Sequence, residues 1–206
     1  MEISKINSRI LKTKLPDLKL GACFICGGAI RDSIIGQKFD DIDIFGCSES
    51  DRHKFVDDNL KEAKQIYDSK FLKTYILDGH KIQIIWRDYA NLKEMLDSFD
   101  YTICQFALGE IQDDDLFEER ESGQFVYCNP ESLIHLFEKR LVVHELNPQF
   151  VANSLERMQK YIKKGYTACN GTIQSLIGGI RSASDKEIED NFEFYPDGSR
   201  KIVRYD

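Results

Sequence analysis

Hydrophobic and polar residues change their spacing several times along the chain, and each spacing predicts one kind of element. The run LGACFIC at residues 20–26 is almost entirely apolar, which is typical of a buried strand. In residues 28–36 the apolar side chains recur at helical spacing, and Gly36 can end the helix. Residues 41–45, DIDIF, alternate polar and apolar as a half-buried strand does. The first part of the chain is therefore predicted to run strand, short helix, strand.

The next segments predict a further helix and more strands. Residues 48–66 carry a helical apolar pattern, with a serine available to cap its start. Residues 72–86, LKTYILDGHKIQIIW, predict a hairpin, because the Asp-Gly pair at their centre suits the positive φ angles of a tight turn. Two short apolar runs, 102–108 and 124–128, predict two more strands.

The pattern becomes helical after residue 128. Asn129 can cap a helix and Pro130 suits its first position, and two stretches with helical spacing follow. We therefore expect an α/β protein of the α+β type, with a mixed β-sheet and flanking helices. Residues 1–128 are the predicted head domain, and residues 129–206 are a small helical, neck-like region.

Composition describes an ordinary globular chain. Of its 206 residues, 42% are hydrophobic and 31% are charged, which is enough apolar mass for a core. No apolar run is long enough to span a membrane, and the first 17 residues lack the apolar region of a signal peptide. We therefore expect a cytoplasmic protein with no membrane partner.

Charge is unevenly distributed along the chain. The net charge of −7 argues against a protein covered with basic residues for nucleic acid. Between residues 139 and 164, however, six basic residues oppose only two acidic ones. This segment fits either a solvated helix face or a surface that contacts phosphates, and the pattern leaves both open. Its basic residues are Lys139, Arg140, Arg157, Lys160, Lys163 and Lys164.

Two motifs contain residue types that bind metals but favour other interpretations. Cys23 and Cys26 form a CxxC, yet they lie in an apolar strand and no second CxxC follows. We expect reduced, mostly buried thiols. The acidic run at 113–115 is predicted to be a solvated loop.

The strongest chemical signal is the segment GGAIRDSIIGQKFDDIDIF, residues 27–45. Gly27 and Gly28 follow a strand and open a helix, so backbone N–H groups are accessible to phosphate oxygens there. Asp41 and Asp43 share one face of a strand because they are two residues apart. Two carboxylates that close are stabilised by a divalent cation with oxygen preference, Mg²⁺ or Mn²⁺. A phosphate site beside a metal site is what a nucleoside triphosphate with its metal requires.

This segment resembles the signature of nucleotidyltransferases of the DNA polymerase β superfamily. More narrowly, it is similar to the head domain shared by class II CCA-adding enzymes and bacterial poly(A) polymerases, in which GG-A-hydrophobic-RD precedes an aspartate–hydrophobic–aspartate strand. The resemblance implies that Asp41 and Asp43 bind the catalytic metal ions, Mg²⁺ or Mn²⁺. It also implies a triphosphate site built from the first motif: Gly27, Gly28, Arg31 and, bracing the loop or the incoming sugar, Asp32.

A later segment matches this family less closely. FDYTICQFAL, residues 99–108, resembles the family's RRDFTINAL and places Asp100 among the nucleotide-binding residues. Ser98 and Phe99 stand where the family has its arginine pair, and Cys104 stands at its asparagine. We therefore expect nucleotide affinity or specificity to differ from that of the family.

The segment HKIQIIWRD resembles the strand that supplies a third carboxylate in these enzymes. Gln83 occupies that position, and Arg87 falls on a family arginine that implies nucleotide binding. A neutral amide is a weaker metal ligand than a carboxylate and cannot act as a base. This departure predicts weak metal binding and a preference for Mn²⁺, and Gln83→Glu should raise turnover or lower the metal concentration needed. The alternative is that Gln83 is a polar strand residue outside any site.

The helical region carries a fainter resemblance. ERMQKYIKKGY is similar to the family's arginine-rich neck helix, and Arg157 and Lys160 lie nearest to its base-selecting template. The sequence does not indicate which base is selected. We expect RNA contacts from four basic residues of this helix: Arg157, Lys160, Lys163 and Lys164.

The leading hypothesis is a metal-dependent nucleotidyltransferase. A hydroxyl would attack the α-phosphate of an NTP, ATP or CTP, and pyrophosphate would leave, with two metal ions at the reacting oxygens. The resemblance favours an RNA acceptor, such as a tRNA-like 3′ end. Two alternatives stay open: a minimal nucleotidyltransferase of the toxin–antitoxin type that modifies a protein or small molecule, and a degenerate module that binds nucleotide or RNA without catalysis.

Overall fold

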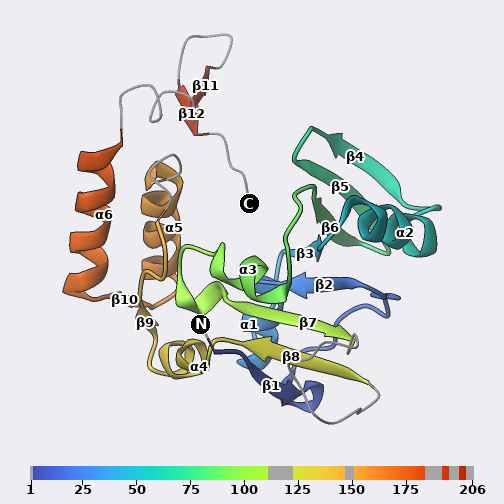
Figure 1. Ribbon diagram of the computed structural model, residues 1–206, viewed down its shortest axis with the longest axis horizontal. Helices are drawn as coiled ribbons and strands as arrows, with labels where there is room; N and C mark the ends of the chain where they lie inside the picture. Colours follow the sequence, from blue (N-terminus) through green and yellow to red (C-terminus); the bar gives the residue numbers. More distant parts are fainter. Residues whose placement is uncertain (1, 111–122, 147–150, 184–191, 195–199, 203–206) are drawn as a thin grey trace.

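The computed structural model describes residues 2–110, 123–146, 151–183, 192–194 and 200–202. Its centre is a mixed eight-stranded sheet (Figure 1). In sheet order the strands are β1 (Ser4–Asn7), β8 (Gln124–Cys128), β7 (Phe106–Glu110), β2 (Cys23–Cys26), β3 (Asp41–Gly46), β6 (His80–Ile85), β5 (Leu72–Leu77) and β4 (Lys64–Asp68). The neighbours β3 and β6 are parallel, and the other neighbours are antiparallel.

Helices flank this sheet and continue beyond it. They are α1 (Gly28–Ile34), α2 (Glu49–Asn59), α3 (Leu92–Asp97), α4 (Pro130–Phe137), α5 (Val151–Lys163) and α6 (Asn170–Ser182), with 3₁₀ turns at Ser8–Ile10 and Thr102–Cys104. Two short strand pairs accompany them: parallel β9 (Arg140–Leu141) with β10 (Thr167–Ala168), and antiparallel β11 (Phe192–Phe194) with β12 (Arg200–Ile202). Figure 1 shows α5 and α6 side by side at one end of the sheet. The predicted fold class is confirmed.

The sheet has an apolar layer on each face, and β3 contributes to both. Ile42 and Ile44 are fully buried in a cluster that includes Ile30 of α1. Phe45 points the other way, into a second cluster with Met95 of α3. The alternation in DIDIF therefore places α1 and α3 on opposite faces of the sheet, and it directs the two aspartates to the α3 face.

Local sequence signals explain several element boundaries. Ser48 caps α2 in a capping box, in which its side chain accepts from the Asp51 N–H and the Asp51 carboxylate accepts from the Ser48 N–H. The predicted hairpin is present: Asp78 and Gly79 have φ angles of 50° and 80° between β5 and β6. These positive angles match the right-handed twist of the two strands.

Two helices end earlier than their spacing predicts. The pattern at 48–66 is helical, but α2 ends at Asn59 and Lys64–Asp68 instead forms β4, paired with β5. Helical spacing continues through residues 131–141, but the helix that starts at Pro130 ends at Phe137, and the chain turns through Lys139 (φ 54°) into β9. In both places long-range strand pairing overrides local helical spacing.

The predicted division after residue 128 crosses a continuous core. Leu136, Leu141, Tyr161 and Tyr166 follow that position, yet they belong to the same buried cluster as the strands and α1. The packing shows no gap at residue 128, so the domain boundary there stays a prediction. Among the described residues, no helix has both the length and the apolarity needed to cross a membrane.

Gly109 of β7 offers a test of core packing. A Cβ at this position would lie 2.3 Å from Cδ1 of the buried Phe24 ring, so Gly109→Ala forces the ring out of place. We expect the free energy of unfolding to fall by about 1–3 kcal/mol in urea denaturation. Gly178→Ala is the matched control: it lies in α6 with nothing within 4 Å of the added Cβ. The control should be neutral or stabilising, and an equal loss in both variants would contradict the packing argument.

Candidate active site

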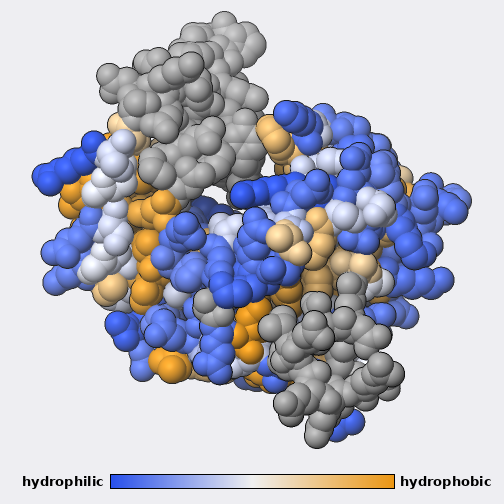
Figure 2. Space-filling view, viewed as in Figure 1, coloured by the Kyte–Doolittle hydropathy of each residue, from blue (hydrophilic) through white to orange (hydrophobic). Residues whose placement is uncertain are grey.

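A cleft of about 490 Å³ lies between the start of β3, the turn before α1, and α5. In Figure 2 hydrophilic side chains border the lower and right sides of a hollow between the helical end of the molecule and the sheet. The lining includes Asp41 and Asp43 of β3, and α5 contributes Arg157, Lys160 and Lys163 together with Glu156. The cleft therefore has the size of a ligand site and brings carboxylates and basic side chains together.

The Gly27 turn forms the rim of the cleft. Gly27 has φ 71° and ψ −125°, a conformation that L side chains rarely adopt. A Cβ there would lie 3.4 Å from the Phe99 ring and 4.0 Å from Oδ2 of Asp43, so the turn runs close to the second aspartate. The Gly27 N–H donates to the carbonyl of Phe106 at 2.8 Å. The Gly27 N–H is therefore already engaged within the fold, although the sequence predicts a phosphate role for both glycines.

Asp41 and Asp43 lie one pleat apart on the same face of β3, and both line the cleft. The parallel pairing with β6 places Lys81 beside Asp41 and Gln83 beside Asp43. The Lys81 ammonium is 3.4 Å from Oδ2 of Asp41, which confirms that these neighbours share a face. The spacing of the two aspartates thus gives the side-by-side geometry expected of it.

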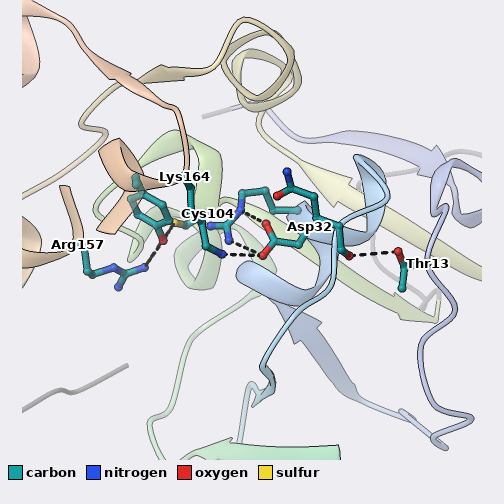
Figure 3. Close-up of polar contacts among 8 residues, drawn as sticks. Thr13, Asp32, Cys104, Arg157 and Lys164 are labelled. Atoms are coloured by element: carbon teal, nitrogen blue, oxygen red, sulfur yellow. Dashed lines mark hydrogen bonds and ion pairs between the residues drawn. The ribbon is translucent and has the colours of Figure 1, made fainter. Parts of the chain in front are cut away.

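Asp32 joins α1 to the end of α5. Its carboxylate accepts two hydrogen bonds from Arg31, at 2.7 and 2.9 Å, and one from the Lys164 ammonium at 3.1 Å (Figure 3). Burial disfavours the ionised carboxylate, but Arg31 and Lys164 outweigh it and hold the pKa of Asp32 below its usual value. We name these three residues the Asp32 clasp.

A second buried polar group lies beside the clasp. The Arg157 guanidinium is 3.4 Å from both the Tyr161 hydroxyl and the Cys104 sulfur (Figure 3). It also lies 3.7 Å from Asp100. The Arg31 guanidinium lies over the Tyr161 ring, 5.0 Å from its centroid. Tyr161 therefore connects the two arginines, and burial raises its pKa to about 12, so its hydroxyl keeps its proton at neutral pH.

Comparison with known protein families assigns the sequence to one of them. Residues 2–139, more than half of the chain, match the description "Gabija anti-defense 2 family protein". The chain belongs to this family. No curated protein matches it.

Solved structures similar to the chain include several tRNA-processing enzymes. The Thermotoga maritima CCA-adding enzyme complexed with tRNA has a TM-score of 0.55 at 20% identity, over 77% of this chain and 38% of that one. A CCA-adding enzyme in complex with CTP has a TM-score of 0.56 at 21% identity, over 77% of this chain and 37% of that one. A tRNA nucleotidyltransferase complexed with a primer tRNA and an incoming ATP analog has a TM-score of 0.52 at 17% identity, over 77% of this chain and 46% of that one.

These likenesses show the fold. The chain has the nucleotidyltransferase head fold of CCA-adding enzymes, as its resemblance in residues 27–45 predicts. It spans less than half the length of these structures.

Most of the predicted site residues meet in the cleft, although their roles stay predictions. The following line it: Gly27, Gly28, Arg31, Asp32, Asp41, Asp43, Arg157, Lys160, Lys163 and Lys164. Asp100 lies behind the cleft lining, against Arg157. Arg87 is exposed after the end of β6, whereas the two aspartates begin the parallel strand β3, so the structure places Arg87 at the opposite end of the sheet.

Sequence reasoning missed Lys81 and Tyr161. The signal for Lys81 was present in part, because it is two residues from Gln83 and must share its strand face. Only the β3–β6 register shows that this face adjoins Asp41. Tyr161 carried no distinguishing signal, since an aromatic residue at helical spacing is typical of a core.

The oxygen ligands present fit a hard divalent cation. Asp41 and Asp43 share a strand face, and the Gln83 side-chain oxygen beside Asp43 is buried without a hydrogen-bond partner in the described chain. No group of three or more His, Cys, Asp or Glu within the described ranges could hold a metal ion. Cys23 and Cys26 are buried free thiols in β2, and the acidic run at 113–115 lies outside the described residues.

The Asp32 clasp predicts a pH-dependent loss of stability. Asp32→Asn leaves Arg31 and Lys164 without their anion, and we expect the free energy of unfolding at pH 7 to fall by about 3–5 kcal/mol. Because the folded pKa of Asp32 is lowered, its contribution is present above the unfolded pKa of about 3.9 and is lost as pH falls through the folded value.

Urea denaturation of both proteins between pH 3 and pH 8 tests this. The wild type and the variant should differ by a constant amount above about pH 5 and converge only at lower pH. The control is Asp58→Asn, which removes an exposed ion pair with Lys54 and should change little. A difference that is the same at pH 3 and pH 7 would contradict a charged Asp32 in the clasp.

Proposed function

We propose that the protein transfers a nucleoside monophosphate from an NTP to a hydroxyl acceptor, and that RNA is the acceptor. One observation carries the proposal: the Gly27 turn, the paired aspartates of β3 and the basic face of α5 line one cleft of about 490 Å³. That volume suits a nucleotide. The arrangement supplies donors for phosphates, ligands for a metal ion and a basic wall for a second anionic substrate.

Arg31 is the principal phosphate donor in this proposal. Its Nε and Nη2 are committed to Asp32, but its Nη1 is buried and has no hydrogen-bond partner in the described part of the chain. A buried donor without a partner is costly, and an anionic oxygen in the cleft would satisfy it. Asp32 and Tyr161 hold the guanidinium in place, so little reorganisation is needed when phosphate binds.

Asp41 and Asp43 are the residues that would hold a divalent cation, Mg²⁺ or Mn²⁺. When bound, such a cation neutralises charge on phosphate oxygens and favours ionisation of the attacking hydroxyl. The protein's own contribution is positional. The Gly27 turn lies against Asp43. Phe99 and Phe45 pack beside it with ring centroids 5.5 Å apart, and together these groups restrict the positions that a bound nucleotide can take.

The basic side chains of α5 favour RNA. Lys160 and Lys163 are exposed, and they line the same cleft as the aspartates. Arg157 and Lys164 line it as well, but they already contact Asp100 and Asp32. Exposed lysines beside a nucleotide site supply sequence-independent contacts to a phosphate backbone.

A protein acceptor is the second candidate. The name of the family implies that its members counteract the Gabija defence. Attachment of a nucleotide to a protein component of that defence would add charge and bulk to it. The same cleft chemistry serves either acceptor, since both present a hydroxyl.

Asp43→Asn tests the transfer reaction. The purified protein is incubated with each α-labelled NTP, Mg²⁺ or Mn²⁺, and total RNA or protein extract. We expect label in RNA for the wild type, and a loss of more than about 100-fold in Asp43→Asn, because even an outer partner of a metal ligand is worth about 10–100-fold. Asp57→Asn, on the exposed face of α2, is the control and should keep full activity.

Each outcome of that assay favours one hypothesis. Label in protein alone would replace RNA by the second candidate. No label with any NTP, together with measurable NTP binding, would overturn the enzymatic proposal and leave a binding module.

Lys160→Glu/Lys163→Glu tests the RNA wall. Both residues are exposed and neither belongs to the Asp32 clasp, so NTP binding should be unchanged. RNA binding should weaken, and the slope of log K against log salt should fall by about 1.4, which corresponds to two single-strand phosphate contacts. Lys61→Glu/Lys64→Glu, outside the cleft, carries the same charge change as a control. Equal RNA affinity in the two variants would contradict RNA binding by this wall.

A further inference from the structure

The β3–β6 register assigns partners to both aspartates of the cleft. Asp41 has Lys81 as its Cα partner, and Asp43 has Gln83. In parallel strands, paired residues on one face are direct neighbours, and the Lys81–Asp41 contact of 3.4 Å shows this for the first pair. The metal-binding face of the sheet therefore holds two carboxylates, one ammonium and one amide.

This set is poorly suited to two divalent cations. Two such ions lie about 3.5–4 Å apart in two-metal sites and repel each other, so they need several anionic ligands between and around them. The described residues form no group of three acids here, and Asp40, which also lines the cleft, is not part of such a group. Lys81 adds a positive charge at Asp41, which opposes a second cation further.

The same set suits one cation. Lys81 contacts Oδ2 of Asp41, which leaves the other oxygen of that carboxylate for a metal ion. Gln83 is 4% exposed, and its Oε1 has no hydrogen-bond partner in the described chain. A neutral oxygen beside Asp43 completes the coordination of one ion without the charge needed to hold a pair.

We propose that the site holds a single divalent cation on Asp41, Asp43 and the Gln83 oxygen, and that the Lys81 ammonium supplies a second positive charge beside these aspartates. This inference rests on the proposed function, in which the two aspartates hold a metal ion. It assigns Lys81 a positioning and charge-balancing role that the sequence pattern alone does not indicate.

Electron paramagnetic resonance of Mn²⁺ tests the inference without requiring activity. The wild type is mixed with an equimolar, non-transferable α,β-methylene NTP and titrated with Mn²⁺. We expect one bound ion per chain and the spectrum of an isolated Mn²⁺. Two ions about 3.5–4 Å apart would couple and change the spectrum.

Two variants test the residues named. Lys81→Ala/Gln83→Glu removes the ammonium and adds a carboxylate, and we expect the stoichiometry to rise from one ion to two, with a coupled spectrum. Lys81→Ala alone should tighten binding of the single ion, and it alters only a half-exposed side chain. Lys73→Ala is the matched control: this lysine of β5 lies over the Trp86 ring and should change neither number nor affinity.

The outcomes separate this inference from the proposed function. A coupled pair in the wild type would overturn the single-ion site and leave nucleotidyl transfer standing. One ion in the wild type and still one in the double variant would overturn the roles of Lys81 and Gln83. No bound Mn²⁺ in any protein would overturn both the inference and the metal-dependent function.

Discussion

The cleft depends on one buried carboxylate. Asp32 lies at the junction of α1 and α5 and accepts hydrogen bonds from Arg31 and Lys164. Lys164 is 132 positions after Asp32 in the sequence. A buried ion pair gives little net stability, because desolvation of the charges cancels most of their attraction. Its effect here is geometric: Asp32 fixes the Arg31 guanidinium against Tyr161 and fixes the end of α5 beside the head.

That geometry determines where charge lies in an otherwise acidic protein. With the end of α5 held at α1, the lysines of this helix line the same cleft as the aspartates of β3. The net charge of −7 says nothing of this, because the local field depends on which charges line the low-dielectric walls. In the proposed function the aspartates hold the cation of the NTP, and the lysines of α5 contact the RNA acceptor.

Local signals made part of this site predictable. A turn that needs positive φ requires glycine, so Gly27 is visible in the sequence. The period of a strand puts Asp41 and Asp43 on one face wherever the strand lies. The Lys81–Asp41 and Lys164–Asp32 contacts are different, because they depend on strand register and on helix packing over long sequence separations. The early end of α2 has the same origin, since β4 forms only by pairing with β5.

The departures from the resembled family are consistent with this arrangement. Phe99 stands where those enzymes have an arginine, and its ring packs against the Gly27 turn and the Phe45 ring at the rim of the cleft. An aromatic ring cannot bind phosphate, but it can contact the base or ribose of a nucleotide. In the proposed function the phosphate-binding task then falls to Arg31, which the clasp already holds. Lys160 and Lys163 line the same cleft, and in the proposal they serve the RNA acceptor rather than the NTP.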